Sequence, residues 1–339
     1  MKSNLFIGQL MTTPWAMEPN VLHAYAKLLA RSYGAKESQT AHDQLAKTVE
    51  FRHPSGVNVA LDVTAQQIRD AVHGSYTHDA AQDAAIQAAA PRAARSATGS
   101  IAVLGLYGPI MQRAGMMDMC TGGTSTQAFT QSLRSAMTDD TVSQILIDID
   151  SPGGSVFGVA ELAAEIRAAR GTKPIIGVAN SMAASAAYWI GSACSEFYCT
   201  PSGQVGSIGV IAAHEDVSKA LEAEGVNVTL ITAGKYKAEG SPYGPLDEEA
   251  LRSIQSDIDG YYADFTSAVA KGRGVSVDAV RSDMGQGRML RGDAAMSAKM
   301  IDGVMNFDDV VKKMQRSAKA SAGGRSARAN AAELALMSL

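Results

Sequence analysis

The chain has 339 residues, of which 46% are hydrophobic and 19% charged, enough to bury the core of one large domain or two ordinary ones. A net charge of −4 argues against a protein that coats nucleic acid. The opening "MKSNLFIGQLMTTPWAM" is a poor signal peptide, and no stretch approaches the roughly 18 uncharged apolar residues of a membrane-spanning helix. The composition therefore indicates a soluble protein that does not bind nucleic acid or a membrane.

Composition divides the chain into four parts. Residues 1–78 are expected to form a helical and mixed region, and residues 79–99 an alanine-rich linker with too few large apolar groups to fold alone. Residues 100–314 have the texture of a folded domain. Residues 315–339 are basic and predict a flexible, solvated tail, with a partner-binding or processed tail as the alternative.

Strands alternate with helices beyond residue 100. Short β-rich apolar runs end at Gly, Pro, Ser or Asn, and amphipathic helical patterns lie between them. This alternation predicts right-handed βαβ units and an α/β fold with a mostly parallel sheet. The predicted strands cover 100–110, 143–154, 173–181 and 226–234, and the predicted helices cover 126–137, 158–170, 182–193, 216–225 and 247–272.

A glycine turn follows the second of these strands, in "DIDSPGGS" at residues 148–155. Ligands of open α/β sheets bind beyond the carboxyl ends of the strands. Gly153 and Gly154 have no Cβ, so a substrate carbonyl could approach their backbone N–H groups, as an oxyanion hole requires. The alternative is an ordinary turn between a strand and a helix.

A serine stands where the third strand gives way to a helix, in "NSMAASAAYWIGSA" at residues 180–193. Ser185 would lie in or near the first helical turn, among alanines that leave room for a substrate chain. This position suits a nucleophile. Ser181 or Ser185 could instead cap the helix, and the small residues could serve tight packing.

A serine nucleophile needs a base, and the histidines offer no triad pattern. Five of the six precede the α/β region, and His214 lies in "IAAHEDVSK". Two lysines, Lys235 and Lys237, follow the predicted strand at 226–234. A lysine accepts a proton only when neutral, which requires burial or hydrogen bonding to the neutral form. The alternative is that both lysines are solvated charges.

Together, "DSPGG", "NSMAASAAYWI", "GSIGV" and "TAGKYKAEGSP" resemble the signal peptide peptidase A family of serine peptidases over roughly residues 100–305. The resemblance implies a ClpP/crotonase-like fold and a Ser-Lys dyad, with Ser185 as nucleophile, Lys237 as base and Ser207 hydrogen-bonded to the lysine. It places the oxyanion hole at Gly153, Gly154 and the N–H of Ala186. Family members usually have two glycines after the nucleophile, whereas this chain has two alanines. The implied chemistry needs no cofactor and no metal.

Within that family, the segment from "GVIAAHEDVSK" to "GSPYGPL" and the "PWAM" start look like the capsid-assembly proteases of bacteriophages and prophages. This branch implies scaffold, portal or capsid proteins as substrates, and a location in the host cytoplasm or in the prohead or virion. Two alternatives stay open. One is a crotonase-like acyl-CoA hydratase or isomerase, and the other is a catalytically inactive structural protein that binds capsid or portal.

The family resemblance also implies a homo-oligomer in which neighbouring subunits could share an active site. The helix at 247–272 carries an apolar stripe at helical spacing, formed by Ile254, Ile258, Tyr261, Tyr262 and Phe265. This stripe packs either on the chain's own sheet or between subunits.

Overall fold

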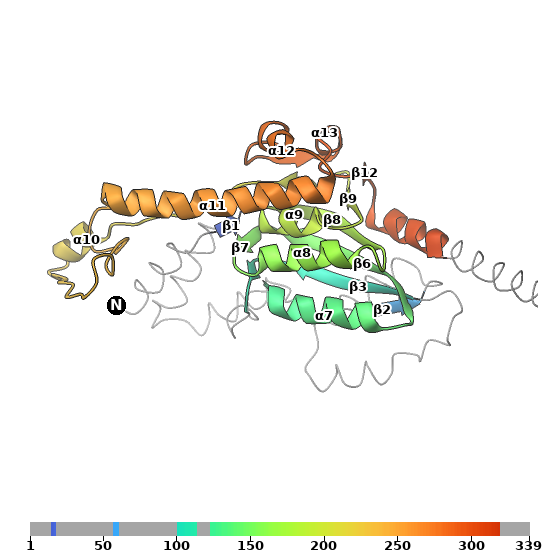
Figure 1. Cartoon of the computed structure of the whole chain (residues 1–339), viewed down its shortest axis with the longest axis horizontal. Helices are drawn as coiled ribbons and strands as arrows, with labels where there is room; N and C mark the ends of the chain where they lie inside the picture. The colour runs from blue at the N-terminus through green and yellow to red at the C-terminus, as the bar shows by residue number, and fades with distance from the viewer. Residues whose placement is uncertain (1–14, 18–56, 61–99, 114–122, 319–339) are drawn as a thin grey trace, which may run out of the picture.

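The computed structural model describes residues 15–17, 57–60, 100–113 and 123–318. The rest of the expected N-terminal region at 1–78, the whole alanine-rich linker at 79–99, Cys120 and the residues beyond 318 lie outside the described residues. Figure 1 shows an α/β body and a long helix, α11, that extends well past it.

The main sheet is mostly parallel, which confirms the predicted α/β class. Its strands follow the order β11-β10-β8-β6-β3-β2, with β9 beside β8 and β12 beside β9. The edge strands β2 and β11 are antiparallel to their neighbours, and the pairs between them are parallel. The strands are β2 (Val57–Ala60), β3 (Ser100–Tyr107), β6 (Val142–Ser151), β8 (Ile175–Ala184), β9 (Glu196–Cys199), β10 (Gln204–Gly206), β11 (Met289–Arg291) and β12 (Gly303–Val304).

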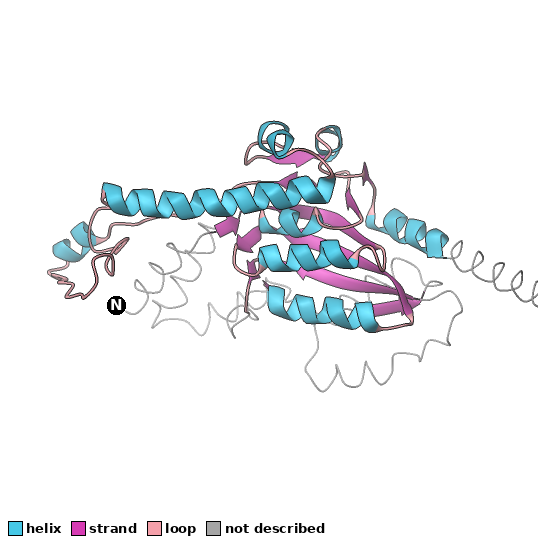
Figure 2. Cartoon of the chain, in the orientation of Figure 1, coloured by secondary structure: helices cyan, strands magenta, loops and turns pink. Residues whose placement is uncertain are grey.

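Helices cover one face of this sheet, as Figure 2 shows. They are α7 (Thr126–Thr138), α8 (Val159–Ala169), α9 (Ala186–Gly191) and α11 (Glu248–Arg273). Their apolar sides meet the strands in one large core, where the rings of Trp189 and Phe265 stack with centroids 4.5 Å apart. Side-chain caps start two of these helices: Ser125 accepts from the N–H of Ala128, and Asp247 from that of Ala250.

The opposite face of the sheet is covered by a helix over residues 307–318. Its apolar residues pack on Val103, Leu146 and Val178, and the amide of Gln144 donates to the carbonyl of Met314. This helix crosses the boundary expected at residue 315, because Ala318 is still buried against the sheet. Two short helices precede and follow β11 in the chain. They are α12 (Val277–Asp283) and α13 (Gly292–Ser297).

A smaller sheet stands beside the main one. Its order is β1-β7-β4-β5, and its strands are β1 (Trp15–Met17), β7 (Gly153–Ser155), β4 (Ile110–Met111) and β5 (Thr124–Ser125). β7 is part of the glycine turn at residues 148–155, and it lies against α9. The small sheet therefore brings the glycine turn next to the segment that carries Ser185.

The segment over residues 211–247 projects from the body, with α10 (Ser218–Ala223) and the N-terminal half of α11 (Figure 1). The strand predicted at 226–234 is wrong, because no residue of that stretch pairs with a strand in the described structure. A β-rich run needs a partner strand and a covered face, and neither is within reach here. Ile231 is consequently 95% exposed.

The apolar stripe of α11 divides along the helix. Phe265 is fully buried against the body, whereas Ile254, Ile258, Tyr261 and Tyr262 are only half-buried. The C-terminal half of the stripe packs on the chain's own core, and the N-terminal half keeps apolar surface exposed.

Candidate active site

Ser185 occupies the junction between β8 and α9, directly before the first helical residue. The helix starts at Ala186 rather than at 182, because Met182–Ala184 pair with Gln204–Gly206 and extend β8. Ser185 has φ +53°, a left-handed conformation that costs an L-residue roughly 1–2 kcal/mol. Its side chain is buried, and its Oγ has one long hydrogen bond, 3.4 Å to the carbonyl of Gly209. A strained backbone thus holds a hydroxyl that has no strong partner.

Ser207 lies next to Ser185 because β8 and β10 run parallel and in register. The N–H of Ser185 donates to the carbonyl of Gly206 at 2.7 Å, and Ser207 follows that glycine. Ser207 also has a positive φ, +54°, and its N–H donates to the carbonyl of Arg288 at 3.0 Å. The structure therefore brings together two serines that lie 22 positions apart in sequence, each in a conformation unusual for serine.

The glycine turn adjoins these serines. Ser151 pairs with Ala183, two residues before Ser185, and β7 begins at Gly153. Gly153 has φ +93°, and a Cβ on Gly154 would lie 1.9 Å from the carbonyl oxygen of Ile110, so both positions require glycine. The N–H of Gly153 donates to Ser151 Oγ at 3.2 Å. The N–H of Ala186, at the start of α9, has no acceptor within the helix.

The strand β1 adjoins the glycine turn, a contact that the sequence does not predict. β1 pairs antiparallel with β7, so that Ala16 stands opposite Gly154 and Met17 opposite Gly153. The sequence signal was the "PWAM" stretch, but nothing local says where such a short strand inserts.

Ile208 and Gly209, the two residues that follow Ser207, line a cavity of about 420 Å³. Gly209, whose carbonyl accepts from Ser185, forms part of its wall. Its size suits one or more side chains of a peptide. The other lining residues are Ile208, Val210, Ile258, Asp259, Tyr262, Arg281, Gln286 and Gly287.

Lys237 does not reach Ser185 within the protomer. It is exposed on the projecting segment, and no hydrogen bond connects the two residues. Its neighbour Lys235 forms an ion pair of 2.9 Å with Glu249. Along α11, Glu249 lies about 14 Å from Ile258, which lines the cavity beside Ser185. Of the six predicted site residues, the structure gathers Ser185, Ser207, Gly153, Gly154 and Ala186, and leaves Lys237 apart.

The histidine and the cysteines of the described domain lie outside the group formed by Ser185, Ser207 and the glycine turn. The Nε2 of His214 is 3.0 Å from the carbonyl of Ser241, in the projecting segment. Among the described residues, no group of three or more His, Cys, Asp or Glu side chains could hold a metal ion. None of the helices in the described ranges is both long and apolar enough to cross a membrane. Cys194 and Cys199 are buried free thiols.

The residues around this geometry are similar to a known protein family. Residues 167–321, which include both serines and Lys237, match peptidase family S49. The match covers a little under half of the chain. The glycine turn at Gly153 lies just before the matched range, and the strands of the same sheet continue across that boundary.

Curated proteins that are similar to this chain include phage proteins. The chain is 34% identical over 227 residues to capsid assembly protease C of Escherichia phage lambda, covering 66% of this chain and 51% of that protein. It is 34% identical over 224 residues to the head-tail preconnector protein GP5 of Enterobacteria phage P21, covering 66% and 44%. It is 28% identical over 205 residues to the chloroplastic serine protease SPPA of Arabidopsis thaliana, covering 60% and 30%. The chain thus spans about half the length of the two phage relatives.

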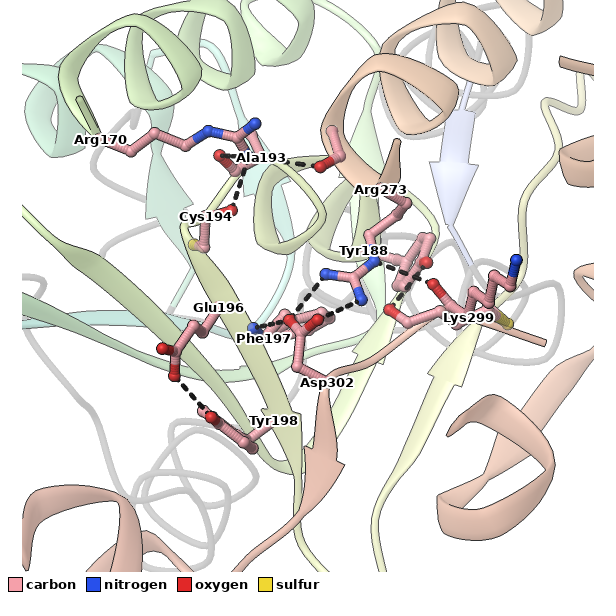
Figure 3. Close-up of polar contacts among 12 residues, drawn as sticks. Arg170, Tyr188, Ala193, Cys194, Glu196, Phe197, Tyr198, Arg273, Lys299 and Asp302 are labelled. Atoms are coloured by element: carbon pink, nitrogen blue, oxygen red, sulfur yellow. Dashed lines mark hydrogen bonds and ion pairs between the residues drawn. The ribbon is translucent and has the colours of Figure 1, made fainter. Parts of the chain in front are cut away.

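A polar network connects Tyr188 of α9 with neighbouring elements (Figure 3). Arg273 forms an ion pair with Asp302 at 2.8 Å, and its Nε donates to the carbonyl of Lys299. Asp302 also accepts from the N–H of Phe197 at 2.7 Å. The hydroxyl of Tyr188, in α9, donates to the carbonyl of Met300. α9 is thereby tied to α11, β9 and the loop before β12.

The Arg273–Asp302 pair predicts an acid-sensitive contribution to stability. Burial alone would raise the pKa of Asp302, but the Arg273 guanidinium and the Phe197 N–H hold that pKa below its usual range. The stabilisation is present at neutral pH and is lost as the pH falls below the usual carboxyl value of about 3.9. We expect Arg273→Ala to cost about 2–4 kcal/mol of unfolding free energy at pH 7, because it strands a half-buried carboxylate.

Urea unfolding of the wild type and of Arg273→Ala at pH 7 and near pH 3 measures the loss of unfolding free energy. The difference between them should shrink at the lower pH. The control is Arg134→Ala, which removes an exposed ion pair with Glu165 and should cost less than about 1 kcal/mol. Equal losses for the two variants would contradict a special role of the buried pair.

Proposed function

We propose that this protein is a serine endopeptidase in which Ser185 is the nucleophile and Lys237 the general base. The observation that carries the proposal is the geometry of Ser185: a weakly bonded hydroxyl on strained backbone, beside a glycine turn and a second serine. The S49 match covers Ser185, Ser207 and Lys237, which supports the same assignment.

The proposed reaction follows from these positions. Neutral Lys237 takes the proton of Ser185, whose Oγ attacks a peptide carbonyl. Backbone N–H groups of the glycine turn and of Ala186 stabilise the oxyanion, each donor contributing about 3–4 kcal/mol to the transition state. The protonated lysine then gives its proton to the leaving amine, and water hydrolyses the acyl-enzyme. In this proposal Ser207, which follows Gly206 next to Ser185, orients the lysine.

The base comes from a neighbouring subunit in this proposal. Lys237 is exposed on the projecting segment, and the segment carries exposed apolar side chains, namely Val228, Leu230, Ile231 and Tyr236. A second copy of the chain would cover these side chains and would receive the lysine beside its own Ser185. The protein would then act as a closed homo-oligomer, since such a head-to-tail contact repeats from copy to copy.

The proposed substrates are scaffold, portal or capsid-associated proteins of a phage head, in the host cytoplasm or the prohead. The similarity to a capsid assembly protease and to a head-tail preconnector protein supports this substrate class. Co-expression with the scaffold and portal proteins of the same genome, followed by gel and mass analysis, tests it. Absence of any Ser185-dependent cleavage product would refute the substrate class.

Labelling by a fluorophosphonate probe tests the chemistry directly. A Ser185 activated by a base should react with the probe, and the adduct should map to the peptide that contains Ser185. An acyl-CoA panel tests the hydratase or isomerase alternative, which leaves Ser185, Ser207 and Lys237 without a joint role. Turnover of any acyl-CoA without probe labelling would favour that alternative.

The pH dependence should distinguish a lysine base from a histidine base. Because lysine accepts a proton only in its neutral form, peptide cleavage should rise from neutral toward alkaline pH. Initial rates between pH 6 and pH 10, with folding monitored in parallel, measure the profile. A rise complete near pH 6.5, the ordinary pKa of histidine, would contradict the proposed base.

A further inference from the structure

β7 has two edges, and in the described structure both are occupied. On one side Gly154 pairs with Ile110 of β4. On the other side β1 pairs antiparallel, with Trp15 opposite Ser155 and Met17 opposite Gly153. The outer edge of the glycine turn is therefore covered by a strand from the chain's own N-terminal region.

The strand β7 lies near the proposed nucleophile. β7 lies against α9, and Ser151, two residues before Gly153, pairs with Ala183, two residues before Ser185. An extended peptide that adds to the edge of a sheet binds through its main chain. Running antiparallel to β7, such a peptide would pass its carbonyls along Gly154 and then Gly153, toward Ser185. β1 follows that path in that direction.

Because pairing at the outer edge of β7 uses main-chain groups, β1 and a substrate peptide would compete for the same edge. The hydrogen-bonding groups on the outer edge of β7 can pair with only one strand at a time, and this pairing does not depend on the partner's side chains. The contact between β1 and β7 is short, three residues on each strand, so it is of the size that another strand can displace.

We propose that the outer edge of β7 is the binding site for an extended peptide, and that residues 15–17 of the chain itself are its resident occupant. β1 must leave β7 before a substrate strand can pair there and reach Ser185. This inference rests on the proposed peptidase function for its consequence, but the strand exchange itself is independent of catalysis. Because β1 is tethered to the body, it competes at a high effective concentration and holds the edge occupied when substrate is scarce.

A proline in β1 tests the proposal. Ala16→Pro removes the central N–H of the strand and disfavours pairing, whereas the control Ala16→Ser keeps the backbone unchanged. We expect Ala16→Pro to increase the rate of fluorophosphonate labelling at Ser185, and of cleavage of a casein probe, by about tenfold. Ala16→Ser should match the wild type. Equal or slower labelling of Ala16→Pro, with an unchanged unfolding midpoint, would overturn the proposal.

A binding measurement separates this proposal from the function. The probe is a fluorescent peptide of residues 11–20, and the proteins are full-length Ser185→Ala with and without Ala16→Pro. We expect the peptide to bind at least about tenfold more tightly when the resident strand is disabled, and a scrambled peptide to bind neither protein. Deletion of residues 2–17 provides a second variant if the proline lowers stability.

Equal peptide affinity for both proteins would overturn the strand exchange even if the protein cleaves substrates. Conversely, absence of labelling and cleavage in every variant would refute the peptidase function, while the peptide affinities still decide the strand exchange. The two failures are therefore distinguishable.

Discussion

Ser185→Ala should abolish proteolysis, with a loss on the order of 10⁴-fold or more, because it removes the hydroxyl proposed as the nucleophile at the junction of β8 and α9. The substitution removes one oxygen whose hydrogen bond within the described residues is 3.4 Å long, so the fold should be unaffected. Cleavage of a co-expressed scaffold protein and probe labelling measure activity, and thermal unfolding measures the fold. Ser185→Ala should lose cleavage and probe labelling and keep the unfolding midpoint of the wild type.

Ser181→Ala is the matched control, because Ser181 lies in the same motif and is hydrogen-bonded to Asp150 rather than placed at the glycine turn. It should retain activity. Retained proteolysis in Ser185→Ala, or its loss in Ser181→Ala alone, would show that the nucleophile is misassigned.

Mixing two inactive variants should restore activity if neighbouring subunits share each site. In a random one-to-one mixture of Ser185→Ala and Lys237→Ala subunits, about one quarter of the interfaces join an intact serine to an intact lysine. Roughly a quarter of the wild-type rate should therefore return. The physical reason is the arrangement in one protomer, where Lys237 is exposed on the projecting segment and Ser185 is buried between β8 and α9.

The control mixes each variant with the double variant, which can complete no site. Lys235→Ala should stay active, since Lys235 is engaged with Glu249. Mixed oligomers, verified by differential tags, that show no recovered activity would place both residues of the dyad in one chain. If Lys237→Ala were active and Lys235→Ala inactive, the general base would be Lys235 and the assignment of Lys237 would be wrong.

Local periodicity predicted most elements of the body. The helices expected at 126–137, 158–170 and 247–272 agree with α7, α8 and α11 within about two residues at their ends, and the β-rich runs at 100–110 and 173–181 became β3, β4 and β8. These segments carry one strong period each, and their apolar residues pack in the core of the body, so local preference and packing agree.

The sequence also determined which parts of the candidate site meet at the sheet. Parallel strands end at one edge, so "DSPGG" after β6 and Ser185 after β8 had to lie close together. The pairing of Ala184 with Gly206 then placed Ser207 beside Ser185. For these residues, strand order and direction are sufficient, and both follow from the alternation of strands and helices.

Only the tertiary structure decided the rest, because it depends on partners distant in sequence. Residues 226–234 have β-rich composition but find no strand to pair with, so the segment projects and carries Lys237 away from Ser185. β1 is three residues long and has no local signal for its partner, yet it pairs with the glycine turn. Strand pairing is a contact between segments, and no single segment encodes where its partner will be.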